Sequence, residues 1–143
     1  METNQHFIER KEKEFSDKKN EYDKRIKNGK KIAKRLLIDM KDIGRQTRMF
    51  FVREAWTFEP QSNLAQKVFI IERLKKYICD KSKMAYPNSW QEGDIEYRIG
   101  YYIVGKIGGA EDKWIWGQYC PIIPGHDLKK LLSNASEKGT LSD

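Results

Sequence analysis

The apolar positions of the first 50 residues repeat with the seven-residue spacing of a coiled-coil seam. Ile8, Phe15 and Tyr22 stand seven residues apart, and the positions between them are charged or polar. The two seam positions continue through Ile26, Ala33, Leu36, Met40, Ile43, Thr47 and Phe50. Residues 5–27 contain neither proline nor glycine. The pattern therefore predicts a helix over residues 5–27, whose apolar stripe needs a partner.

The chain after residue 27 has two interpretations. In the first, one helix runs over residues 5–48. In the second, which we favour, Asn28-Gly29 ends the first helix in a left-handed cap and a second helix begins near Lys31. In both, residues 5–48 form a charged helical arm, as one helix or as a helical hairpin, in front of a small α+β domain over residues 49–143.

The apolar pattern also predicts the elements of that domain. Residues 49–61 are apolar and end near a proline, and their type stays open. Residues 63–79 carry apolar side chains at helical spacing and predict a helix. Residues 95–107 are rich in β-branched and aromatic residues and predict a strand. Residues 113–120 return antiparallel to that strand and complete a hairpin.

A last helix is predicted over residues 127–137, and the tail from Thr140 onward is expected to fray. The predicted fold class is therefore α+β. Its antiparallel sheet is centred on the hairpin of residues 95–120 and packs with two helices. A long charged N-terminal helix or helical hairpin precedes it.

Alternation along the predicted hairpin divides its side chains between two faces. With Val104 opposite Trp116, one face resembles a core and contains Tyr97, Ile99, Tyr101, Ile103, Ile115 and Tyr119. The other face contains Glu96, Arg98, Tyr102, Lys106, Trp114, Trp116 and Gln118. Aromatic rings beside cations suit the stacking of bases and contacts with phosphates. The same face also suits a second core layer under a helix, and both interpretations remain open.

The charge of the chain is concentrated in one segment. The net charge is +7, and residues 24–48 contain ten Lys and Arg residues against Asp39 and Asp42. Such a segment attracts polyanions by counterion release, although a solvated helix face has the same composition. The candidate nucleic-acid-binding residues are Lys30, Lys31, Lys34, Arg35, Arg98, Lys106, Trp114 and Trp116.

Candidate catalytic residues are Glu96, Arg98, Tyr102 and His126. Side chains of these types act as general acids, general bases and stabilisers of developing charge in metal-independent ribonucleases. Their spacing here is not diagnostic of that chemistry. His6 and His126 are far apart and have no ligands at metal-site spacing, so we expect no metal, and the chain has no nucleotide-binding glycine motif that implies a cofactor.

The chain also contains no apolar run of the length that spans a bilayer, so we expect no membrane partner. Its first residues are polar and resemble no secretory signal, which favours a cytoplasmic location. The leading hypothesis is a small intracellular nucleic-acid-associated binding protein that uses the basic helical arm and the aromatic and basic hairpin face. One alternative is a homo-oligomer paired through the heptad seam. A further alternative is a metal-independent ribonuclease-like enzyme, and we favour a protein that is not an enzyme.

Overall fold

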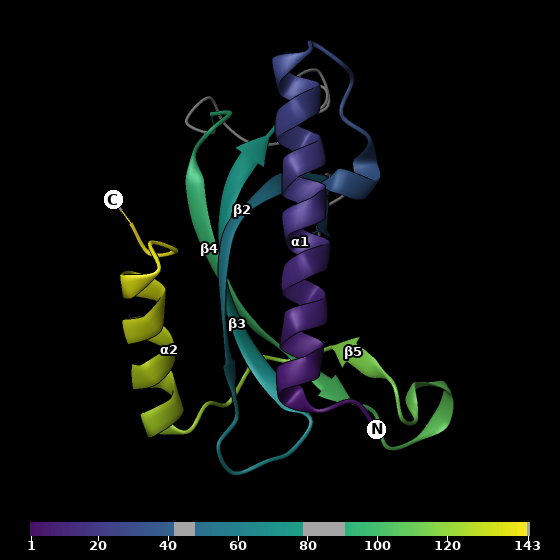
Figure 1. Cartoon of the computed structure of the whole chain (residues 1–143), viewed down its shortest axis with the longest axis vertical. Helices are drawn as coiled ribbons and strands as arrows, with labels where there is room; N and C mark the ends of the chain where they lie inside the picture. Colours follow the sequence, from purple (N-terminus) through teal and green to yellow (C-terminus); the bar gives the residue numbers. More distant parts are fainter. Residues whose placement is uncertain (42–47, 79–90, 143) are drawn as a thin grey trace.

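The residues that the structure describes form one antiparallel five-stranded sheet with a helix on each face. The structure, a computed structural model, describes residues 1–41, 48–78 and 91–142. The strands lie in sequence order, β1-β2-β3-β4-β5. Figure 1 shows the long helix α1 along one face of the curled sheet and the short helix α2 on the other side of it. The α+β class is thus confirmed, but the hairpin lies at one edge of the sheet and β3 occupies the centre.

Helix α1 spans Asn4–Lys27, close to the range predicted from the seven-residue apolar spacing and the absence of proline and glycine. Thr3 caps its first turn by accepting a hydrogen bond from the backbone N–H of His6 at 3.1 Å. The helix ends at Asn28, and Gly29 adopts φ +65°. This conformation favours glycine, because an L side chain is strained there. The predicted break at Asn28-Gly29 is therefore confirmed.

The second helix predicted from Lys31 is wrong. The chain instead forms a 3-10 turn, η1 (Lys34–Leu36), and then strand β1 (Ile38–Lys41), which pairs with the start of β2. Pairing with the next strand outweighs the local helical spacing here, because a seven-residue apolar repeat over one short segment favours a helix only weakly. The seam residues Ile43 and Thr47 lie outside the described residues.

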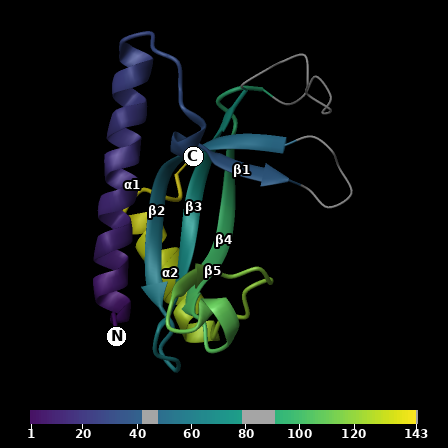
Figure 2. The ribbon, with the colours of Figure 1, turned by 90° about the vertical axis from the view of Figure 1, so that its right-hand side faces the viewer.

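The seam residues of α1 face the chain's own sheet. Phe15 and Tyr22 are 4% and 6% exposed, and Phe7 and Ile8 are buried beside them. The first two turns pack on β2, β3 and β4, and Tyr22 packs with residues of the following connection. In Figure 2 the whole length of α1 runs beside the sheet. The apolar stripe predicted for pairing with another chain therefore forms the intramolecular core.

Strands β2 (Arg48–Pro60) and β3 (Lys67–Tyr77) form the long central pair. The helix predicted over residues 63–79 is therefore wrong. Val68 and Ile70 pack under α1, whereas Phe69 and Ile71 pack under α2, so both faces of β3 are buried. A strand that is buried on both faces reads as a continuous apolar run, which periodicity does not distinguish from a buried helix.

Strands β4 (Ile95–Val104) and β5 (Trp114–Trp116) confirm the predicted hairpin with shorter strands. The 3-10 turn η3 (Gly108–Ala110) lies in the connection between them. Tyr102 pairs with Trp116 and Val104 pairs with Trp114, a register two residues away from the predicted one. Because a shift of two residues preserves the alternation, the same side chains still share a face.

The prediction that Tyr97, Ile99 and Ile115 belong to the core face of the hairpin is wrong, whereas the alternative prediction, that the opposite face is a second core layer under a helix, is confirmed. Tyr97, Ile99 and Ile115, assigned to the core, are 40%, 39% and 38% exposed. Tyr102 is buried on the opposite face, where Trp114 and Trp116 pack against the core under α1. The burial follows from the position of α1, which covers this face.

Helix α2 spans Gly125–Glu137, close to the predicted range. Leu131 and Ala135 pack on Phe69 and Ile71 of β3. The expected fraying of the tail is wrong at Thr140, which is 1% exposed and whose Oγ1 lies 2.8 Å from Oγ1 of Thr57. The end of the described chain is thereby fixed to β2.

Candidate functional site

A buried ion cluster lies on the α1 face of the sheet. The side chain of Glu72 on β3 is 0% exposed. Its carboxylate accepts a hydrogen bond from Nε of Arg53 at 2.7 Å and from Nε and Nη2 of Arg98 at 2.9 and 3.1 Å. Arg98 stands directly opposite Glu72 on β4, whereas Arg53 comes from the β-bulge of β2. Two guanidinium groups thus share one carboxylate.

Aromatic and sulfur-containing side chains enclose the two guanidinium groups. Cζ of Arg53 lies 3.6 Å from the ring centroid of Phe15, and Cζ of Arg98 lies 4.4 Å from that of Trp116. Nη1 of Arg98 is 3.4 Å from Sδ of Met40, which lies on β1. Two strands separate β1 from β4 in the sheet, so this contact requires the strong curl seen in Figure 2. The cluster therefore lies inside the curve of the sheet.

Tyr102 lies next to this cluster and stays protonated at neutral pH. Burial raises the pKa of its hydroxyl to about 12, because water no longer stabilises the phenolate. Its ring packs edge-on against Trp116 with the centroids 5.0 Å apart. A hydroxyl with this pKa is a poor general base, and the ring of Tyr102 packs in the core under α1.

The four candidate catalytic residues do not converge on one site. Arg98 and Tyr102 lie on the same face of β4. Glu96 is half exposed at the start of the strand and pairs with Nζ of Lys76 at 3.1 Å. His126 is exposed in the first turn of α2, on the opposite side of the sheet. Among these four side chains the structure brings together only Arg98 and Tyr102.

The two tryptophans of the hairpin face α1 and are half buried. The ring of Trp114 stacks on Phe7, and Trp116 lies between Arg98 and Tyr102. Lys106, at the end of the hairpin strand, is exposed with its Nζ 3.4 Å from Oε1 of Gln66. The sequence therefore correctly places Arg98 and Trp116 on one face of the hairpin. In the structure, however, the guanidinium of Arg98 and the ring of Trp116 contact other side chains of this chain.

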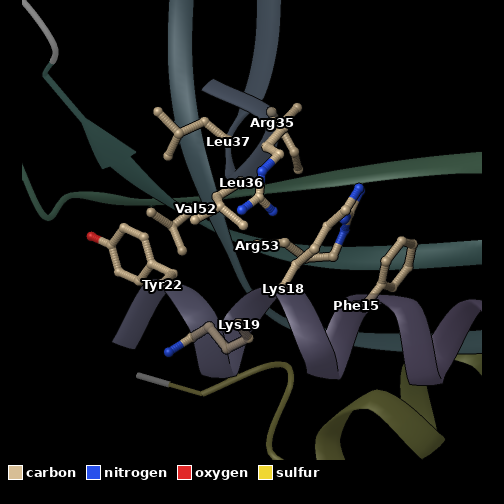
Figure 3. A pocket seen from close by; sticks show the side chains of 10 residues that line it. Phe15, Lys18, Lys19, Tyr22, Arg35, Leu36, Leu37, Val52 and Arg53 are labelled. Atoms are coloured by element: carbon tan, nitrogen blue, oxygen red, sulfur yellow. The ribbon is translucent and has the colours of Figure 1, made fainter. Parts of the chain in front are cut away.

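A cavity of about 110 Å³ opens next to Arg53, between α1, the connection after it and β2. Figure 3 shows Phe15 and Tyr22 at its two ends, with Lys18, Arg35 and Arg53 between them. We call it the inner pocket; its lining residues are Phe15, Lys18, Lys19, Tyr22, Arg35, Leu36, Leu37, Ile38, Val52 and Arg53. The pocket thus combines four cationic side chains with apolar ones, and the larger part of its exposed lining is polar.

A second group of cations lies where α1 ends. We call it the basic corner; its residues are Lys24, Arg25, Lys27, Lys30, Lys31, Lys34 and Arg35. Residues 24–38 contain no Asp or Glu. The cations of the last helical turn are favoured there, because the helix dipole is negative at its C-terminus. A hollow of about 430 Å³ is lined here by Glu21, Lys24, Arg25, Asn28, Lys30 and Arg35.

Glu21 is the carboxylate that the structure places against the basic corner. It accepts hydrogen bonds from Arg35 and from Nε of Arg25, the latter at 3.0 Å. The hydrogen bond from Arg35 is the main reason that the pKa of Glu21 lies below its ordinary value. Lys34 instead places its Nζ 5.8 Å from the ring centroid of Phe50. Among the described ion pairs, Glu21 thus pairs with two of the seven cations of the corner.

Lys18, Lys19, Arg53 and Glu72 were not predicted from the sequence as site residues. The signal for Glu72 was present: Glu72 and Arg73 interrupt an otherwise apolar run. Charged residues in such a run are rarely buried unless they are paired. The helix assigned to residues 63–79 hid this signal, because on a helix these charges would face solvent.

Comparisons with known proteins returned no match: no family model, no curated protein and no solved structure is similar to this chain. In the part of the chain that the structure describes, no group of three or more His, Cys, Asp or Glu side chains has the arrangement of a metal site. Neither described helix has the length and apolar character required to cross a bilayer.

Proposed function

We propose that this chain is a nucleic-acid-associated binding protein that holds the phosphate backbone at the basic corner. The observation that carries the proposal is the density of cations there. Seven Lys and Arg side chains lie within residues 24–35, and the structure places only Glu21 against them among the described carboxylates. Lys27, Lys30 and Lys31 are exposed and are free to reach phosphates.

The hairpin face makes a smaller contribution to this function than its composition indicates. Trp114 and Trp116 pack against the core under α1, so base stacking on them would require that helix to move. Binding is therefore mainly electrostatic and depends little on base sequence. The positive charge of the corner attracts the backbone, and the released counterions favour the complex at low salt.

The test is fluorescence anisotropy with a labelled single-stranded RNA and a labelled DNA duplex between about 50 and 200 mM salt. The Lys27→Gln/Lys30→Gln/Lys31→Gln variant removes three exposed cations from the corner. The matched control, Lys113→Gln/Lys129→Gln/Lys138→Gln, removes three exposed cations elsewhere. We expect the corner variant to reduce the log–log salt slope by about two to three and the affinity by tenfold or more.

The control variant carries the same loss of net charge, so it measures the effect of overall charge alone. We expect it to change the affinity by less than about threefold, because distant charges are screened at these salt concentrations. Equal losses in both variants, or binding that does not change with salt, would contradict the proposal.

A further inference from the structure

The inner pocket faces a buried cluster with an excess of positive charge. Arg53 and Arg98 share the carboxylate of Glu72, so the three groups carry a formal charge of +1. The side chains of Arg53 and Arg98 are 16% and 23% exposed and that of Glu72 is 0% exposed. An uncompensated charge in such surroundings is costly, and a bound anion would balance it.

Arg53 has donors left for such an anion. Within the described part of the chain its hydrogen bond to Glu72 uses Nε, and its guanidinium also lines the inner pocket. A guanidinium carries five N–H groups in a planar fork that fits two oxygens of one anion. Among the described contacts of Arg53 only Nε donates a hydrogen bond, which leaves the N–H groups on its two Nη atoms for an anion in the pocket.

Two further cations line the pocket from its rim. Lys18 pairs with Glu14 at 3.3 Å, and Arg35 pairs with Glu21. The carboxylates of Glu14 and Glu21 are 37% and 35% exposed, so these are surface ion pairs. Such pairs contribute little net free energy and can exchange one anion for another.

The size and walls of the pocket restrict what it can hold. Its volume of about 110 Å³ exceeds that of a water site, but it is well below the roughly 300–1,000 Å³ of pockets for drug-sized ligands. Leu36, Val52 and Tyr22 form apolar parts of its wall. A low-dielectric wall strengthens the attraction between cations and a small anion.

We propose that the inner pocket binds one phosphate group, held by Arg53 at its base and by Arg35 and Lys18 at its rim. The group could come from free phosphate or from the end of a nucleic-acid strand, since the chemistry that recognises it is the same. Arg35 also lines the hollow at the basic corner, so a strand lying on that corner can present its terminal phosphate here. The proposal does not require the nucleic-acid function, because it stands on the pocket and the ion cluster.

The test is isothermal titration of the full chain with inorganic phosphate at low, constant ionic strength. Substituting Arg53 would also disturb Glu72, so the variants are Arg35→Gln and Lys18→Gln at the rim. The matched control is Arg25→Gln: Arg25 also pairs with Glu21 but does not line the inner pocket. We expect saturable binding that Arg35→Gln weakens about tenfold and Lys18→Gln weakens in the same direction, with little change in Arg25→Gln.

A second titration compares an oligonucleotide with a 5′-phosphate and the same strand with a 5′-hydroxyl. Tighter binding of the phosphorylated strand, lost in Arg35→Gln, identifies a strand end as the source; equal binding of the two strands identifies free phosphate. The proposal is overturned if phosphate does not saturate the wild-type chain by about 10 mM, or if Arg25→Gln and Arg35→Gln weaken phosphate binding equally. The Lys27/Lys30/Lys31 variant tests the proposed function separately, because these three lysines do not line the inner pocket.

Discussion

The ring of Phe7 lies flat against the indole of Trp114, with 4.1 Å between the ring centroids and 14° between their planes. Phe7 is 0% exposed and belongs to the first turns of α1, whereas Trp114 begins the edge strand β5. This contact joins the start of the chain to the last strand of the sheet. It also covers one face of the Trp114 indole.

The Phe7–Trp114 contact predicts that Phe7→Ala destabilises the fold strongly. Removing a fully buried aromatic ring leaves a cavity among Phe58, Tyr102 and Trp114, and such changes cost about 3–5 kcal/mol. Urea unfolding followed by circular dichroism measures the loss. The control is Ile26→Ala on the same helix, where the side chain is 52% exposed and the expected change is within about 0.5 kcal/mol. Equal effects of the two substitutions would show that α1 is not anchored by its first turns.

Glu72→Gln tests the buried ion cluster. Glutamine keeps the shape of the side chain but removes the charge, which leaves the partly buried Arg53 and Arg98 without this carboxylate. We expect a loss of about 3–5 kcal/mol in the free energy of unfolding. The control is Glu54→Gln: Glu54 pairs with Arg73 at 2.7 Å, but its side chain is 29% exposed, so the expected cost is about 0–1 kcal/mol. A Glu72→Gln variant as stable as Glu54→Gln would contradict the role of Glu72.

Gly100→Ala tests how closely Trp116 approaches the β4 backbone. A Cβ atom at Gly100 would lie 2.2 Å from the indole ring of Trp116, and that ring is confined between Arg98 and Tyr102. We expect a cost of about 1–3 kcal/mol and a changed near-ultraviolet circular dichroism spectrum, since the indole must move. Gly109→Ala, where no heavy atom lies within 4 Å of the added Cβ, is the control and should be neutral or slightly stabilising. Wild-type stability in Gly100→Ala would show that the indole is not confined.

The elements that the sequence predicted well are those with strong local signals. Helix α1 has a regular apolar spacing, no internal proline or glycine and the Asn28-Gly29 stop, and the β4–β5 hairpin has dense β-branched and aromatic residues. Strand β3 has no comparable local signal, because helices cover both of its faces and its apolar residues therefore do not alternate. The strand became identifiable only through its pairing with β2 and β4.

The candidate site shows the same division between local and long-range information. The basic corner is visible as a run of cations, and alternation on β4 groups Arg98 with Tyr102. The partnership of Arg53 with Glu72 depends on the register between β2 and β3, which the sequence did not reveal. The choice of core face depended on the location of α1, and the heptad seam did not indicate that its partner is the sheet of the same chain.

The carboxyl group of Asp127 should make the free energy of unfolding depend on pH. In the first turn of α2 its carboxylate accepts a hydrogen bond from the backbone N–H of Ser62 at 2.9 Å, which connects the β2–β3 turn to the helix. This hydrogen bond lowers the pKa of the carboxyl below its ordinary value of 3.8. A carboxyl with a lowered pKa in the folded state stabilises the fold above its unfolded pKa, and this contribution is lost as the pH falls through the folded value.

Asp127→Asn should therefore be less stable than the wild type at pH 7, by about 1 kcal/mol, because the amide keeps an acceptor but loses the charge. The difference should shrink as the pH falls below about 4, where the wild-type carboxyl becomes protonated as well. Thermal unfolding of both chains between about pH 3 and 7 measures it. Asp112→Asn, an exchange of the same kind at an exposed turn, should track the wild type throughout. A destabilisation by Asp127→Asn that stays constant across this range would assign the effect to packing of the amide and not to the charge of Asp127.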